Sequence, residues 1–130
     1  MLHLTDRPAI VRDPDDPKQV RRAERLVFRR NKTLRIAIGK VLSTPEGRHV
    51  WRAIMDACRL TEPAFSTDAL EMAYLQGRRA IGCELRADAI EIGVNLYLTL
   101  ESEAMARQSR EDSEIEAAHI ASATSATEED

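Results

Sequence analysis

The sequence has few aromatic residues and no long apolar run. Five of its 130 residues are aromatic, so a core must rest mainly on Leu, Ile, Val, Ala and Met, which suits helix-on-helix packing. The longest apolar run is far shorter than the roughly 20 residues that cross a bilayer. The first residues also lack the basic start and apolar stretch of a signal peptide. We therefore expect a cytoplasmic chain that does not enter a membrane.

Residue groups typical of catalysis are missing as well. The five glycines are scattered and form no phosphate-binding loop. His3, His49 and His119 lie far apart in the sequence, and Cys58 and Cys83 are 25 positions apart, so their spacing indicates neither a metal site nor a Cys–His pair. We predict that the protein is not an enzyme. We also predict no catalytic, cofactor-binding or metal-binding residues and no cofactor.

The net charge of −3 conceals a separation of charge along the chain. Residues 111–130 contain seven acidic residues and neither Lys nor Arg. The remaining 15 acidic residues face 19 basic ones within residues 1–110, a net charge of +4. The sequence therefore predicts a basic body and an acidic tail.

Two helix starts can be recognised from their capping residues. Asp16 is followed by Pro17, and Thr44 by Pro45, which is typical of an N-cap with proline in the first turn. We predict helices from residue 17 to about 42 and from 45 to about 59, packed as an antiparallel hairpin because their connection is short. The periodic apolar residues of the first helix are Val20, Ala23, Val27, Leu34, Ile38 and Val41. One face of the second is marked by Gly47, Val50, Trp51, Ile54 and Cys58.

The second half of the chain is harder to interpret. A third helix is expected after a cap at Ser66 or Thr67 and should run to about Leu85. Apolar residues alternate over 88–100, as in a strand, but a lone strand would lack a partner. We favour a helix there, with Ala89, Leu96 and Leu100 on one side. The predicted fold is all-α: an extended arm over 1–16, a small helical bundle over 17–110 and an acidic flexible tail over 111–130.

Two groups of residues are candidate binding sites. On the first helix, six cations fall at three- and four-residue steps within an arc of about 100°, opposite the apolar face: Lys18, Arg21, Arg22, Arg25, Arg29 and Lys32. They could bind a phosphate backbone or an acidic protein surface, or form a solvated face. Gly77, Arg78 and Arg79 are a possible interface, although a helix crossing would also explain them. Trp51 and Phe65 fit either a core or an interface hot spot, and the spacing of Trp51 favours the core.

The middle of the chain contains a recognisable combination of segments. Thr44-Pro45-Glu46-Gly47-Arg48 precedes Trp51, Ile54, Cys58 and Phe65, and Ala73-Tyr74-Leu75-Gln76-Gly77-Arg78-Arg79-Ala80-Ile81-Gly82 follows. Over residues 44–85 this combination resembles a family of short bacteriophage proteins from the virion gene cluster of Bordetella-type short-tailed phages. The resemblance implies a phage origin and a link to the virion.

Together, these observations predict a non-catalytic structural or assembly protein. We expect a virion component at or near the portal or head–tail junction, present in the host cytoplasm before assembly. Its partners would be portal, adaptor or tail proteins and further copies of itself. The alternative is a nucleic-acid-binding packaging or regulatory protein similar to a small terminase subunit.

Overall fold

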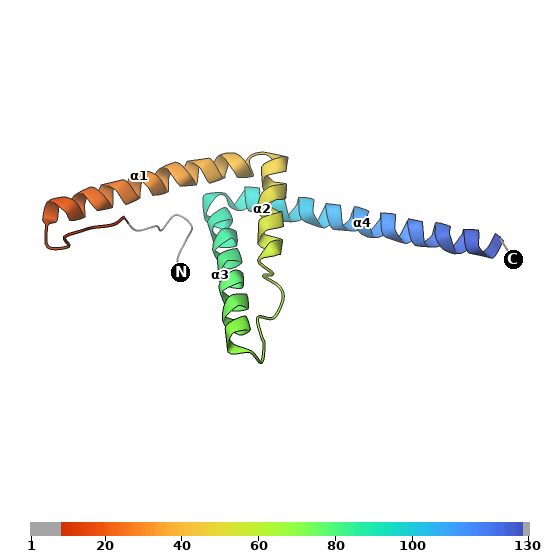
Figure 1. The fold of residues 1–130 in the computed structure, drawn as a ribbon. Coiled ribbons are helices and arrows are strands. Elements are labelled where there is room, and N and C mark those ends of the chain that lie inside the picture. Colours follow the sequence, from red (N-terminus) through yellow and green to blue (C-terminus); the bar gives the residue numbers. More distant parts are fainter. Residues whose placement is uncertain (1–8, 129–130) are drawn as a thin grey trace.

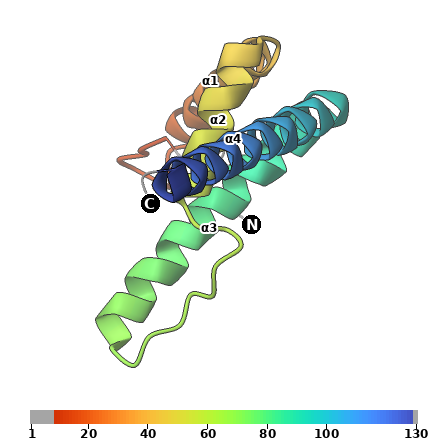
Figure 2. The same ribbon diagram turned by 90° about the vertical axis from the view of Figure 1, so that its right-hand side faces the viewer.

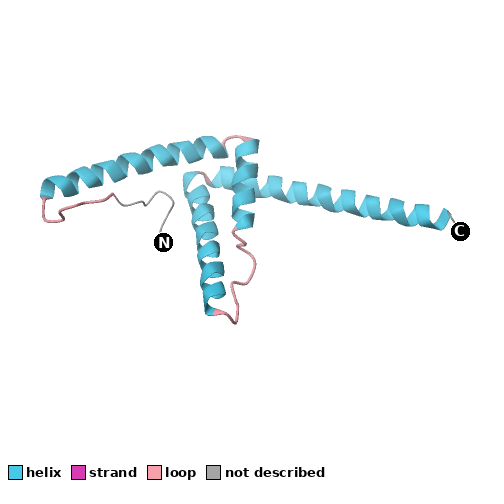
Figure 3. Cartoon of the chain, in the orientation of Figure 1, coloured by secondary structure: helices cyan, strands magenta, loops and turns pink. Residues whose placement is uncertain are grey.

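The computed structural model describes residues 9–128 as four α-helices joined by loops (Figures 1 and 3). Within these residues there is no strand, so the predicted all-α fold is confirmed. The helices span Pro17–Leu42 (α1), Pro45–Ala57 (α2), Ala69–Ile92 (α3) and Val94–Glu128 (α4).

Side-chain caps fix the starts of the first three helices. Asp16 accepts a hydrogen bond from the Lys18 amide and Thr44 accepts one from the Gly47 amide, which confirms both predicted caps. At α3 the prediction of Ser66 or Thr67 is wrong. Asp68 is the cap, and its carboxylate accepts from the amides at the second and third helical positions.

The alternating segment is helical on both sides of a break. Gly93 ends α3 with an extended backbone, φ −168°, and α4 begins at the next residue. The predicted helical character is confirmed, but the single helix is wrong: Ala89 belongs to α3, whereas Leu96 and Leu100 belong to α4. Ala89 and Leu100 are both fully buried. The strand-like alternation therefore arises because two helices of different direction share one apolar stretch.

Figure 1 shows α1 lying across the end of α2, with α3 running back beside α2. The antiparallel pair in the structure is thus α2 with α3, whereas the prediction paired α1 with α2 side by side. Buried residues of α1 are confined to its end, at Ile38 and Leu42, because its preceding turns project beyond the other helices (Figure 1). The first turns of α4 close the bundle, and α4 contacts all three other helices. Figure 2 shows α4 crossing the α2–α3 pair.

A small core joins the four helices. Its buried apolar residues are Ile38, Leu42, Trp51, Met55, Leu85, Ala89 and Leu100. The Trp51 ring is buried, and its Nε1–H donates to the carbonyl of Leu85, 3.3 Å away. Trp51 is therefore a core residue, as favoured, and Phe65 is exposed. The predicted face of α2 is partly wrong, since Val50 and Ile54 are exposed and Met55 is buried.

Two helical arms leave the bundle in opposite directions (Figure 1). Residues 17–33 of α1 form one, here called the basic arm. Residues 111–128 of α4 form the other, the acidic arm, whose side chains are exposed throughout 111–127. The predicted acidic tail is therefore a continuation of α4 in its described part, and its expected flexibility stays a prediction. Residues 129–130 lie outside the described residues.

The described part of the N-terminal segment, residues 9–16, is non-helical and runs back along α1 (Figure 1). The Asp13 amide donates to the Gln19 side chain, 3.2 Å away. Residues of this segment and of α1 line an open groove, among them Ala9, Ile10, Ala23 and Leu26. The predicted extended arm agrees with this segment, while residues 1–8 lie outside the described residues.

Candidate interaction surfaces

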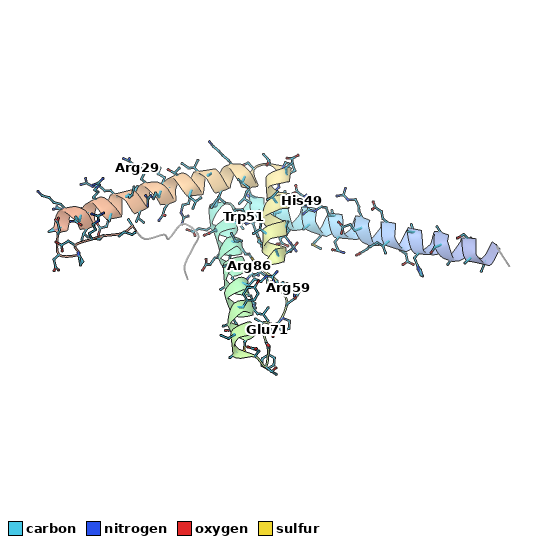
Figure 4. All side chains as sticks on the ribbon, viewed as in Figure 1. Arg29, His49, Trp51, Arg59, Glu71 and Arg86 are labelled. Atoms are coloured by element: carbon cyan, nitrogen blue, oxygen red, sulfur yellow. The ribbon has the colours of Figure 1, made fainter. Side chains whose placement is uncertain are left out.

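The basic arm presents its cations to solvent. All six predicted residues are exposed: Lys18, Arg21, Arg22, Arg25, Arg29 and Lys32. The Arg21 side chain donates to the Pro17 carbonyl of its own helix, 3.2 Å away. No ion pair within the described residues includes any of the six. Figure 4 labels Arg29 on the part of α1 that extends beyond the bundle. Among the described residues the arm is therefore a cationic surface without ion-pair partners, and it can bind anionic groups.

Arginines within the bundle are used differently, and Arg48 is the clearest example. This buried side chain holds Glu103 through two hydrogen bonds, from Nε at 3.0 Å and from Nη2 at 2.7 Å. Its Nη1 also donates to the Leu42 carbonyl at the end of α1, 2.9 Å away. These bonds hold the pKa of Glu103 below its ordinary value. Arg48 thus links α1, α2 and α4.

Two further arginines connect helices within the bundle. Arg52 of α2 donates to Glu101 of α4 at 2.6 Å and to Asp56 at 2.8 Å. Arg35 of α1 pairs with Glu91 of α3 at 2.9 Å. These pairs are partly exposed, so each orients the side chains of two segments but contributes little to the free energy of unfolding.

Arg78 and Arg79, predicted as a possible interface, make contacts within the chain. Arg78 Nε donates to the Ala57 carbonyl at 2.6 Å, and Arg79 Nε donates to the Leu60 carbonyl at 3.2 Å. They therefore satisfy one backbone acceptor at the end of α2 and one in the loop that follows it. Gly77 is exposed, and nothing lies within 4 Å of where its Cβ would be. Whether these residues also contact a partner stays a prediction.

The glycine of this motif that permits close approach is Gly82. A Cβ there would lie 2.7 Å from Cys58 Cβ and 3.0 Å from Leu60 Cγ. The missing side chain lets the end of α2 and the following loop pack directly on α3. Sequence reasoning missed this role because Gly77 and Gly82 are equally plausible when their neighbours are unknown.

Exposed apolar side chains accompany the charges on both arms. Phe28 and Ile36 are exposed on α1, Phe28 with 72% of its surface accessible. They lie three and four residues from Arg25 and Lys32, which places them beside the cations. On α4, Met105, Ile115 and Ile120 are exposed. Sequence reasoning missed these residues because it treated the arms by charge alone.

The described residues contain no group of three or more His, Cys, Asp or Glu placed to hold a metal ion. None of the described helices is long and apolar enough to span a membrane. Cys58 and Cys83 are both half-buried free thiols and form no disulfide with each other.

These features define a small helical-bundle protein with two oppositely charged helical arms. The model of the Bbp19-like phage protein family matches residues 38–102, and the chain belongs to this family. The match begins at the first buried core residue, Ile38, and ends just after the last, Leu100. It therefore covers the bundle, and both arms lie outside it. No curated protein and no solved structure matches the chain.

Proposed function

We propose that this phage protein is a non-catalytic structural component of the virion, located at or near the portal or head–tail junction and present in several copies. The observation that carries the proposal is the arrangement of a family-defining bundle between two exposed arms of opposite charge. Such arms offer surfaces for neighbouring proteins.

Several features support this role. The arginines of the bundle hold its own helices together, which leaves a compact unit that can be placed as a whole in a larger particle. The arms add about 26 Å on one side and about 27 Å on the other, at 1.5 Å per helical residue. They can therefore contact proteins beyond the bundle's immediate neighbours, such as portal, adaptor or tail components.

Quantitative mass spectrometry of purified, nuclease-treated particles tests the proposal. The protein should be present at a fixed ratio to the portal protein, corresponding to several copies per particle. Infected-cell lysate provides the control for abundance before assembly. Complete absence from particles, with abundant protein in the lysate, would remove the virion role and favour a regulator.

A second function, binding of nucleic acid during packaging or regulation, is supported by the exposed cations of the basic arm. If they engage phosphates, log affinity for duplex DNA falls linearly with log salt, by about 0.9 per phosphate engaged. Changing Arg21, Arg25 and Arg29 to Ala should then flatten that slope and weaken binding to all DNA sequences about equally. A salt-independent affinity, or one unchanged in the variant, would exclude this mode.

A further inference from the structure

The two arms complement each other in charge but lie too far apart to meet within one chain. They project from opposite sides of the bundle (Figures 1 and 2). In the described residues no ion pair joins them. Both charges therefore remain available to another molecule.

The acidic arm also lacks a surface within the described residues that would bury one of its faces. A helix of this length draws most of its stability from the burial of one face. Residues 111–127 are all exposed, so no face of this segment is buried against the bundle. A surface that covers this helix would supply the missing contacts.

The residues on one side of the acidic arm, together with Met105 in the part of α4 just before it, indicate the nature of that surface. Met105, Asp112, Glu116 and Ile120 recur at steps of seven and four, so they share one face of α4. Met105 and Ile120 are exposed by 72% and 56%. This face combines apolar residues with carboxylates, and it fits a partner that combines apolar residues with cations.

The basic arm has that composition. Arg25 and Arg29 are four residues apart, with exposed Phe28 beside them and exposed Ile36 one turn beyond Lys32. The two arms also have nearly the same length, about 26 Å and about 27 Å. Phosphate contacts would use the cations but leave Phe28 and Ile36 without a role, so a protein helix is the better match.

We propose that the basic arm of one copy binds the acidic arm of a second copy of this chain. Because each chain carries both halves of the contact on opposite sides, one interaction can add copy after copy. The contact deepens the proposed function, because it supplies a way to build the several copies that the virion role requires.

Sedimentation of the full-length protein tests the contact with two charge-reversal variants. One carries Arg25→Glu and Arg29→Glu, and the other carries Asp112→Lys and Glu116→Lys. The wild type should associate, less strongly as salt is raised. Each variant alone should associate at least about tenfold more weakly. An equimolar mixture should associate more strongly than either variant, because the intact acidic arm of the first variant meets the intact basic arm of the second. The two reversed arms are also opposite in charge to each other.

A matched control carries Lys40→Glu and Arg86→Glu, which change the charge equally at exposed sites outside the arms. It should associate like the wild type, and circular dichroism should show that every variant is folded. A wild type that stays monomeric, variants that associate normally, or a mixture no stronger than its parts would overturn the proposal. So would duplex DNA binding at physiological salt, lost in the Arg25/Arg29 variant, without self-association.

The outcome is independent of particle composition. A protein found in virions that does not self-associate would refute the contact and leave the virion role intact. A protein that self-associates through its arms but is absent from virions would do the reverse.

Discussion

The arginines of the bundle contact acceptors within the fold, whereas the cations of the basic arm are exposed to solvent. Arg48 and Arg52 hold α4 through paired carboxylates, and Arg78 and Arg79 hold carbonyls at the end of α2. Arg25 and Arg29 of the basic arm have no ion-pair partner among the described residues. The same residue type thus stabilises the fold in the bundle and is available to another molecule in the basic arm. Substitutions should therefore affect folding in the bundle and assembly in the arms.

The largest effect on folding is expected at Trp51. Trp51→Ala removes a buried ring and its hydrogen bond to Leu85, and it should lower the free energy of unfolding by about 3–5 kcal/mol. Phe65→Ala, at a residue with 75% of its surface exposed, should change it by less than about 0.5 kcal/mol. Urea denaturation followed by circular dichroism measures both. Equal effects would contradict the assignment of Trp51 to the core.

The two glycines of one motif should respond in opposite directions. Gly82→Ala forces a Cβ to 2.7 Å from Cys58 Cβ and should cost about 1–3 kcal/mol. Gly77→Ala places a methyl group in open space on the surface of α3, and it should raise the free energy of unfolding by about 0.5–1 kcal/mol. Thermal melts of the pair check the prediction. A stabilising Gly82→Ala would show that α3 does not pack closely against the end of α2.

Acidification should weaken the bundle through Glu103. Its pKa is lowered in the folded state by hydrogen bonds from Arg48, so its stabilising contribution is present above the unfolded pKa. That contribution is lost as the pH falls through the folded pKa. The urea midpoint should therefore drop between pH 7 and about pH 3. In Glu103→Gln the urea midpoint should drop less over the same pH interval. A pH dependence equal to that of the wild type would show that Glu103 does not contribute to the loss of stability in acid.

The local features of the fold were predictable, and the long-range ones were not. A capping residue followed by proline marks a helix start within a few positions, so Asp16 and Thr44 were identified correctly. The break at Gly93 was missed because alternating apolar residues fit a strand, one helix or two. The partners of Arg48, Arg78 and Arg79 lie 55, 21 and 19 positions away, and nothing in the neighbouring sequence indicates them.

The candidate sites follow the same rule. The prediction of the six cations on the basic arm depends on helical periodicity within one element, and all six are exposed as that periodicity implies. Gly77, Arg78 and Arg79 form a motif whose role depends on another element, and the structure gives the two arginines a role inside the fold. The apolar residues beside the charges were overlooked because burial cannot be inferred for a helix whose neighbours are unknown.

Removal of the acidic arm should have the smallest effect on the bundle. Truncation after Arg110 leaves every buried core residue in place and should change the unfolding free energy by less than about 0.5 kcal/mol. Truncation after Tyr97 is the control, because it also removes Leu100 and Glu103, and this chain should not fold stably. A marked loss of stability on truncation after Arg110 would mean that the acidic arm packs on its own bundle.

The most direct test of the account is the incorporation of arm variants into particles. Phage encoding Arg25→Ala and Arg29→Ala should yield particles with a reduced content of this protein, although the purified variant is as stable as the wild type. Lys40→Ala and Arg86→Ala, which remove the same charge elsewhere on the surface, should leave its content unchanged. Mass spectrometry of the three particle preparations gives the ratios. Equal incorporation of all three chains would contradict the claim that the basic arm is used for assembly.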